Sequence, residues 1–325
     1  MSGFNSDAEK RAALDELTAE EVAFLTRDWQ VWARDDQLPP EGFGHGGAWR
    51  VWLILGGRGA GKTRSGAEWV RAKALGIAPV GAEPARRIAL VGETMADVRR
   101  VMIEGASGIL SVHADDERPE IEVSKGQLVW PNGAVAQMFS AEAADGLRGP
   151  QFDAAWCDEL AKWREPENAW DMLQFALRLG DRPQVCLTTT PRPIPLLRAI
   201  LDDAGTVVTR ARTHDNATNL APHFVAEMTR RYAGTALGRQ ELDGELIDET
   251  AGSLWRRDWI EAGRVAGAPE LERIVVAVDP PVTATAASDA CGIVVAGKGS
   301  DGRAYVLADH SLQGREPLVW AKAAI

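Results

Sequence analysis

The sequence predicts an α/β protein with a mainly parallel sheet flanked by helices, followed by the first strands of a second sheet. Apolar strand patterns alternate with helical patterns from residue 49 to about 211, and a glycine-rich loop joins the first strand to the next helix. From residue 271, strand patterns follow one another instead. Alternating strands and helices favour parallel pairing, whereas short turns favour antiparallel pairing. We therefore expect an N-terminal domain over 1–212, a helical linker region over 213–270 and an incomplete second domain over 271–325.

The spacing of apolar residues predicts the elements of the first domain. Residues 7–34 have apolar side chains near helical spacing. The apolar run WRVWLIL (49–55) suits a strand that is buried on both faces. Further strands are expected at 87–92, 152–157, 184–190 and 206–211, further helices at 62–75, 94–103, 166–179 and 193–201, and a β-hairpin over 121–139 turning at PNG (131–133).

The pattern changes after residue 212. A polar connector, THDNATNLAP, leads into short helical patterns at 222–233 and 235–242. Strands are then expected at 272–280, 291–299 and 303–309, with a hairpin turn at GSDG (299–302) and a helix that begins at Glu316.

Composition restricts the class of protein. The chain has 325 residues, of which 45% are hydrophobic and 26% charged, so it is neither disordered nor collagen-like. No apolar run reaches the roughly 18–20 residues of a membrane span, and the N-terminus lacks a signal peptide, so we expect a cytoplasmic protein without membrane contact. The net charge of 36 − 47 = −11 argues against a surface coated in DNA-binding charge, although a local basic groove stays open. The cysteines are far apart and predict buried thiols, and the histidines lack zinc-ligand spacing.

The strongest motif is GGRGAGKT, which matches the phosphate-binding loop G-x-x-x-x-G-K-[ST]. Glycines let successive N–H groups point at phosphate oxygens, and the helix that follows adds its positive dipole end. Lys62 would reach the β- and γ-phosphates of ATP, and the Thr63 hydroxyl would complete the Mg²⁺ shell. The predicted nucleotide-binding residues of the loop are Gly56, Gly57, Arg58, Gly59, Ala60, Gly61, Lys62 and Thr63.

Two acids end the predicted strand FDAAWC and supply the other half of an ATPase site. Asp158 suits the role of holding Mg²⁺, and Glu159 suits the role of polarising the attacking water. A solvated pair at a helix N-terminus is the alternative. Arg58 in the loop and Arg148 in DGLRGPQFD compete for neutralising transition-state charge, against an ordinary surface role.

Further polar residues end other strands. Thr188, Thr189 and Thr190 are placed to sense the γ-phosphate, or else form a plain β-propensity run. In the last region, Asp279 ends a strand, with Asp289 ten residues later and Asp309 ending the third strand. Such acids begin two-metal nuclease sites, although turn chemistry is the commoner reason for them.

The order of these motifs resembles the large terminase subunit, the DNA-packaging motor of phages, and particularly its versions in gene transfer agents. GGRGAGKT, GLRG, the strand ending in Asp158 and Glu159, TTTP, a linker and VAVDPP follow one another over essentially the whole chain. The resemblance implies a P-loop NTPase domain of the RecA/ASCE-like type, followed by a ribonuclease-H-like nuclease domain that uses Mn²⁺ or Mg²⁺.

The resemblance also implies roles for residues and partners. Lys62 and Thr63 would form the Walker A pair, Asp158 and Glu159 the Walker B pair, and Thr188 to Thr190 the coupling motif. Arg148 would serve an adjacent subunit of a ring-shaped homo-oligomer. Arg34 and Gln37, in WARDDQLPP, would contact adenine. Double-stranded DNA, a portal protein and a small terminase subunit would be the partners, in the cytoplasm of a bacterial host.

One departure and two alternatives accompany this interpretation. The family's nuclease site draws carboxylates from later strands, so we expect a complete ATPase with a truncated, inactive nuclease part in which Asp279 is the strongest metal ligand. The alternatives are a small-molecule P-loop kinase and a nucleotide-gated interaction module without turnover. Of the three, only the motor predicts ATP hydrolysis that DNA stimulates.

Overall fold

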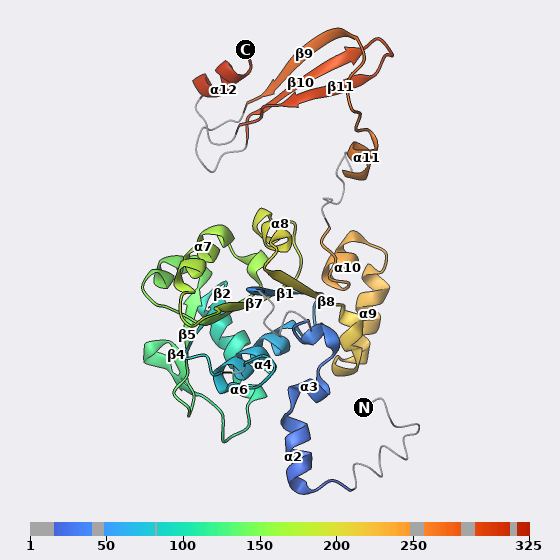
Figure 1. Cartoon of the computed structure of the whole chain (residues 1–325). Helices are drawn as coiled ribbons and strands as arrows, with labels where there is room; N and C mark the ends of the chain where they lie inside the picture. The colour runs from blue at the N-terminus through green and yellow to red at the C-terminus, as the bar shows by residue number, and fades with distance from the viewer. Residues whose placement is uncertain (1–15, 41–48, 82, 248–256, 281–289, 313–316) are drawn as a thin grey trace. The chain divides into compact units, whose positions relative to one another are not determined.

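The computed structural model describes residues 16–40, 49–81, 83–247, 257–280, 290–312 and 317–325. The chain forms two compact units, Met1–Ala251 and Gly252–Ile325 (Figure 1). The predicted boundaries at 212 and 270 divide the chain more finely and stay predictions.

Among the described residues, the first unit contains an eight-stranded sheet with the order β3-β4-β5-β2-β6-β7-β1-β8. The six strands from β5 to β8 in this order are parallel, and β3 and β4 join antiparallel at one edge. The predicted α/β class is thereby confirmed. The strands are β1 (Val51–Gly56), β2 (Arg87–Gly92), β3 (Glu120–Glu122), β4 (Gln127–Val129), β5 (Val135–Ser140), β6 (Ala154–Asp158), β7 (Gln184–Thr189) and β8 (Thr206–Ala211).

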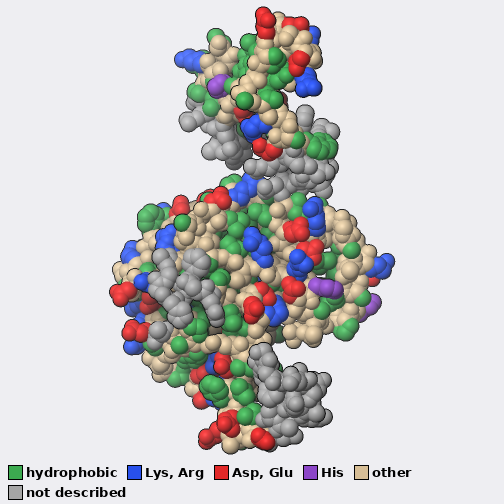
Figure 2. All heavy atoms as spheres, turned by 45° about the vertical axis from the view of Figure 1, so that its right-hand side comes forward, with side chains coloured by type: hydrophobic (Ala, Val, Ile, Leu, Met, Phe, Trp, Pro, Cys, Tyr) green, Lys and Arg blue, Asp and Glu red, His purple; other side chains and the backbone are tan. Residues whose placement is uncertain are grey.

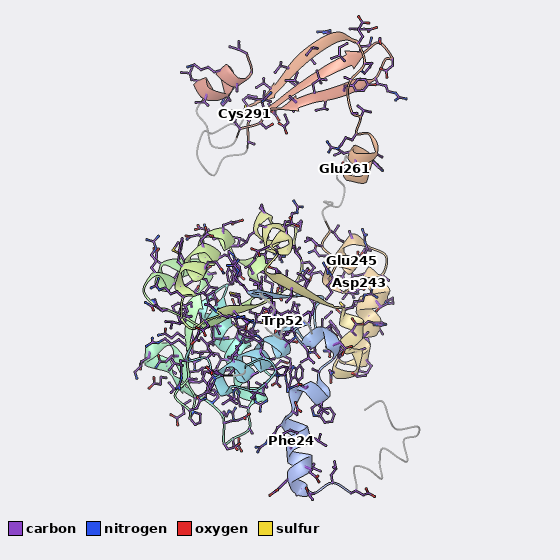
Figure 3. All side chains as sticks on the ribbon, in the orientation of Figure 1. Phe24, Trp52, Asp243, Glu245, Glu261 and Cys291 are labelled. Carbon is purple, nitrogen blue, oxygen red and sulfur yellow. The ribbon has the colours of Figure 1, made fainter. Side chains whose placement is uncertain are left out.

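Helices cover both faces of this sheet, and an apolar core lies under each layer (Figure 1). Trp52, labelled in Figure 3, points to the face covered by the helix after β1, whereas Leu53 points to the opposite core. Because β1 is buried along its whole length, its sequence is continuously apolar. The helices are α2 (Ala19–Arg27), α3 (Trp29–Trp32), α4 (Lys62–Leu75), α5 (Met95–Asp97), α6 (Ile109–Val112), α7 (Pro166–Ala176), α8 (Pro195–Asp202), α9 (Pro222–Tyr232) and α10 (Ala236–Glu241).

Two predicted helices differ from the structure. The described part of 7–34 contains two helices, α2 and α3, because Asp28 has an extended backbone and its side chain caps α3 by accepting from Gln30 N. The helix predicted over 94–103 begins as α5 and continues as a π-helical segment, η2 (Val98–Ile103). Apolar periodicity does not reveal the second change, because Val98, Met102 and Ile103 still face the core, and the first change depends on the local cap at Asp28.

The segment after β8 returns to the carboxyl ends of the central strands. It forms a short 3₁₀ helix, η6 (Thr213–Asn219), and then α9 and α10. Thr213 is buried, and its N–H donates to the carbonyl of Leu242. These elements therefore pack beside the glycine-rich loop that ends β1.

The second unit has α11 (Arg257–Ala262), a three-stranded antiparallel sheet and α12 (Pro317–Ala323). The sheet has the order β11-β10-β9, with β9 (Leu271–Asp279), β10 (Gly292–Gly299) and β11 (Ala304–Asp309). These strands and the hairpin between β10 and β11 confirm the predicted elements. The three cysteines of the chain are buried and unpaired, as predicted.

Candidate nucleotide-binding site

The glycine-rich loop lies between β1 and α4, at the carboxyl end of the sheet. Gly59 and Gly61 have φ of 71° and 94°, which a residue with a Cβ adopts only with strain. Lys62 is the first residue of α4 and is 7% exposed. Its Nζ donates to the carbonyls of Gly56 and Gly57 at 3.0 and 2.9 Å and to Thr190 Oγ1 at 3.2 Å. The ammonium group is thus held at the mouth of the loop.

The two acids lie at the end of β6, two strands away from β1. Asp158 is 7% exposed, and its Oδ1 lies 2.5 Å from the Thr188 hydroxyl. Glu159 has a φ of 53°, which turns the chain away from the strand. Its carboxylate accepts from Thr190 N at 3.1 Å and lies 3.7 Å from Lys62 Nζ. Lys162, three residues further on, lies 3.9 Å from the same carboxylate.

These charges shift one another's pKa values. Burial raises the pKa of Asp158 to about 6, with a further contribution from the charge of Glu159. Burial alone would also raise the pKa of Glu159, but Lys62, Lys162 and the bonds from Thr190 outweigh it, so that pKa is lowered. Burial lowers the pKa of Lys62 despite the two carboxylates nearby. Glu159 therefore carries the negative charge of the pair more readily than Asp158.

The three threonines at the end of β7 connect these groups. Thr188 contacts Asp158, the Thr189 hydroxyl accepts from Ala161 N at 3.1 Å, and Thr190 contacts both Glu159 and Lys62. All three threonines are buried. The structure therefore brings together residues from β7, β6 and the glycine-rich loop.

A pocket of about 980 Å³ opens over the loop. Arg58 lines it, and its Nε donates to Glu241 of α10 at 2.5 Å. Gln37 also lines the pocket, whereas Arg34 and Arg148 are not among the lining side chains. The lining residues that were predicted as site residues are Gln37, Arg58, Gly59, Ala60, Gly61, Lys62, Thr63, Glu159 and Thr190.

Other lining residues carried no sequence signal. Trp29 and Trp32 of α3 and Asn216 and Asn219 of η6 belong to the pocket. Arg64, directly after the phosphate-loop motif, lies over the Trp29 ring at 5.1 Å from its centroid. The tryptophans resembled core residues in sequence, and the asparagines resembled loop residues. Lys162 could have been found, because it follows Glu159 by one helical turn.

The acids of the second unit lie apart from one another. Asp279 ends β9 and Asp309 ends β11, with β10 between them. Asp309 accepts from the Ser311 N–H and hydroxyl, and Asp289 lies outside the described residues. In the part of the chain that the structure describes, no group of three His, Cys, Asp or Glu side chains could hold a metal ion. No helix there is long and apolar enough to cross a membrane.

The parallel sheet and the glycine-rich loop together define a P-loop protein of the α/β class. The profile of the family "Terminase large subunit, T4likevirus-type, N-terminal" matches residues 53–262, which is more than half of the chain. The chain therefore belongs to the large terminase family, which supports a DNA-packaging ATPase. The predicted resemblance to the large terminase subunit is confirmed.

Solved structures agree with this fold. The large terminase of a thermophilic bacteriophage in complex with ADP has 14% identity and a TM-score of 0.54, over 89% of this chain and 71% of that chain. Another crystal form of the same terminase has 15% identity and a TM-score of 0.52, over 92% and 71%. The bacteriophage HK97 large terminase has 16% identity and a TM-score of 0.50, over 90% and 62%. A search of curated proteins finds no match.

Proposed function

We propose that this chain is the ATP-hydrolysing subunit of a motor that translocates double-stranded DNA into a phage-like capsid. The observation that carries the proposal is the bonded cluster of Lys62, Glu159 and Thr190 at the floor of the pocket. A lysine on the phosphates, an acid for water and a polar group at a neighbouring strand end are the parts that ATP hydrolysis requires.

The residues present fit a magnesium ion. Asp158 is a buried carboxylate whose raised pKa reflects burial beside another acid, and a cation would relieve that cost. The Thr63 hydroxyl and the Asp158 carboxylate are the hard oxygen donors that Mg²⁺ prefers. When bound with ATP, the ion would neutralise charge on the β- and γ-phosphates.

Each remaining group has a role that follows from its position. Lys62 binds the phosphate oxygens, and Glu159 orients the attacking water and accepts its proton. Thr190 contacts both groups, and with Thr188 and Thr189 it passes a change at the γ-phosphate to β7. Gln37 lines the pocket, and we propose that it contacts the adenine together with Arg34, which donates to the carbonyl of Ala60. Arg58 or Arg148 neutralises the developing charge on the phosphates.

The wider assignments rest on the family. We propose a ring of identical subunits that meets a portal protein and a small terminase subunit in the cytoplasm of a bacterial host, in a phage or a gene transfer agent. We also propose that the second unit is part of a ribonuclease-H-like endonuclease. There Asp279, with weaker contributions from Asp289 and Asp309, would bind Mn²⁺ or Mg²⁺, and cutting of DNA by this chain would be weak or absent.

The decisive experiment measures ATP hydrolysis with and without double-stranded DNA, for the wild type and for Lys62→Ala. We expect DNA to stimulate the wild type and the variant to be inactive, because it lacks the charge that binds the β/γ-phosphates. Hydrolysis that DNA leaves unchanged would contradict the motor. Near-normal turnover by Lys62→Ala would contradict the phosphate-loop assignment, and a circular dichroism spectrum like that of the wild type would establish that the variant folds.

A further inference from the structure

Three successive carbonyls of the phosphate loop accept hydrogen bonds from side chains of two other segments. The Thr213 hydroxyl donates to the carbonyl of Arg58 at 2.7 Å. Asn216 Nδ2 donates to that of Gly59 at 2.7 Å, and Arg34 Nη2 donates to that of Ala60 at 2.7 Å. We call these three side chains, Thr213, Asn216 and Arg34, the brace. It holds the loop through its carbonyl groups, and Asn216 also lines the pocket over the loop.

The brace acts on the N–H groups that a phosphate would meet. Each carbonyl shares a rigid peptide plane with the N–H of the next residue, which points the opposite way. Fixing the carbonyls of residues 58–60 therefore orients the N–H groups of Gly59, Ala60 and Gly61, three residues that line the pocket; the N–H of Ala60 is also held by the carbonyl of Gly57 at 3.3 Å. A hydrogen bond to a carbonyl also polarises the N–H of the same peptide group, and that N–H becomes a stronger donor.

Asn216 is the residue that joins the two segments. Its amide nitrogen reaches the loop, while its Oδ1 accepts from Arg34 Nη1 at 2.9 Å and from Asn219 Nδ2 at 2.9 Å. A guanidinium cannot accept a hydrogen bond, so this orientation of the amide is fixed by its partners. Arg34 is held in turn by Asp36, at 2.9 and 2.8 Å. Removing Asn216 therefore loosens both the loop and Arg34.

We propose that Asn216 is a positioning residue for nucleotide binding, which preorganises the phosphate loop through the carbonyl of Gly59. The inference rests on the proposed function, because it takes the phosphates of ATP as the ligand. In this proposal Asn216 acts through the loop, by its hydrogen bond to the carbonyl of Gly59. The affinity that it supports is consequently affinity for the triphosphate group.

This distinction sets the experiment. Dissociation constants for MgATP and for magnesium tripolyphosphate are measured by calorimetry on the full chain. The wild type is compared with Asn216→Ala and with Thr213→Val, which removes another donor of the brace at nearly constant volume. His214→Ala is the matched control, because this exposed side chain lies in the same 3₁₀ helix. The melting temperature of each protein without ligand reports on the fold.

We expect Asn216→Ala to bind both ligands roughly threefold to tenfold more weakly, the usual consequence of losing one hydrogen bond. The KM for ATP rises by a similar factor and kcat changes less, while the melting temperature stays within a few degrees. Thr213→Val lowers the affinity for both ligands in the same way, and the affinities of His214→Ala match those of the wild type.

Two results would overturn the inference. Unchanged affinity for both ligands would show that the brace does not organise the loop. A loss confined to MgATP would show that Asn216 supports binding of the nucleoside, directly or through Arg34, and not of the triphosphate. Should Asn216→Ala fail to fold, the affinities of Thr213→Val for MgATP and magnesium tripolyphosphate test whether the brace organises the loop. A wild type that binds neither ligand would instead refute the proposed function and the inference with it.

Discussion

Asp158 and Glu159 are adjacent acids whose environments separate their pKa values. Asp158 is enclosed at the strand end, whereas Glu159 turns toward two lysines and the N–H of Thr190. Groups that are pushed apart in this way take different roles in a site. A carboxylate that stays ionised suits a general base, and a buried one that resists ionisation suits a cation site. This separation underlies two predictions.

Glu159→Gln is expected to bind ATP but hydrolyse it roughly 10²–10⁴-fold more slowly, the usual size of a lost general base. The amide oxygen still accepts from Thr190 N, so the loop and Asp158 keep their positions. Calorimetry measures binding, and steady-state phosphate release measures turnover. A variant that also loses ATP binding would give Glu159 a structural role and favour the interaction module over the motor.

Asp158→Asn is expected to stabilise the protein without nucleotide, and to do so more at high pH. The folded-state pKa of Asp158 is raised from 3.8 to about 6, so the folded protein binds this proton more tightly than the unfolded chain does. Wild-type stability therefore falls as pH rises from about 4 to 6. The asparagine variant lacks this loss, so its free energy of unfolding at pH 8 should exceed that of the wild type by up to about 3 kcal/mol.

Urea unfolding at pH 4, 6 and 8 provides the measurement for Asp158→Asn. The difference from the wild type should be small at pH 4, where Asp158 is protonated in the folded protein and only partly ionised in the unfolded chain, and largest at pH 8. An equal difference at all three pH values would mean that the charge of Asp158 is not the cause. The variant should also lose ATP hydrolysis, since the amide is a poor ligand for Mg²⁺.

At the scale of elements, the sequence predicted most strands and helices of the sheet but not its order. The expected ranges for β2, β8 and α4 agree with the structure residue for residue. Buried parallel strands are continuously apolar, and the glycine-rich loop marks the start of α4, so these boundaries have local causes. Strand order depends on contacts between segments far apart in sequence, which a single apolar run does not encode.

Some residues of the candidate site could likewise be predicted from the sequence, and others could not. Residues at the ends of β1, β6 and β7 could be grouped in advance, because the carboxyl ends of parallel strands meet at one edge of the sheet. The brace could not be predicted from the sequence, because Asn216 lies in a polar connector where asparagine is ordinarily a turn residue. Arg34 was recognised by its segment, but its bonds to Asp36 and Ala60 depend on how that segment packs.

The contact between the phosphate loop and the end of α10 leads to a prediction for Gly57→Ala. A Cβ on Gly57 would lie 2.3 Å from the carbonyl oxygen of Leu242, which is backbone and cannot rotate away. The loop and α10 must separate, so we expect the free energy of unfolding to fall by about 1–3 kcal/mol, with weaker ATP binding.

Gly267→Ala is the matched control for Gly57→Ala, because a Cβ there meets nothing within 4 Å. Its free energy of unfolding should stay the same or rise slightly. Denaturant unfolding and calorimetry with MgATP compare the two variants. A Gly57→Ala protein as stable as the wild type would mean that α10 moves away at no cost.

At the scale of the whole molecule, the charges bear on how subunits and DNA meet. The face of the first unit in Figure 2 shows Lys and Arg side chains interspersed with Asp and Glu. This agrees with the net charge of −11 and gives no large basic patch on that face. In the proposed ring, electrostatic attraction of DNA would depend on how several subunits combine their charges.

Arg148 tests whether one subunit completes the site of another. Its Nε pairs with Asp145 at 2.9 Å, and the two side chains are 66% and 83% exposed, so the pair is weak and Arg148 can leave it at little cost. It does not line the pocket of its own chain, whereas Arg58 does. Both features favour action on a neighbour.

We expect Arg148→Ala alone to hydrolyse ATP about 10³–10⁵-fold more slowly. A mixture of Arg148→Ala with Lys62→Ala should recover activity, because an intact phosphate loop then meets an intact arginine at roughly a quarter of the interfaces of a mixed ring. Phosphate release is measured for each variant and for the equimolar mixture, under conditions in which light scattering shows oligomers. If oligomers form and the mixture stays inactive, Arg148 acts within its own chain or not at all. The pocket-lining Arg58, held by Glu241, would then be the arginine that neutralises the phosphates.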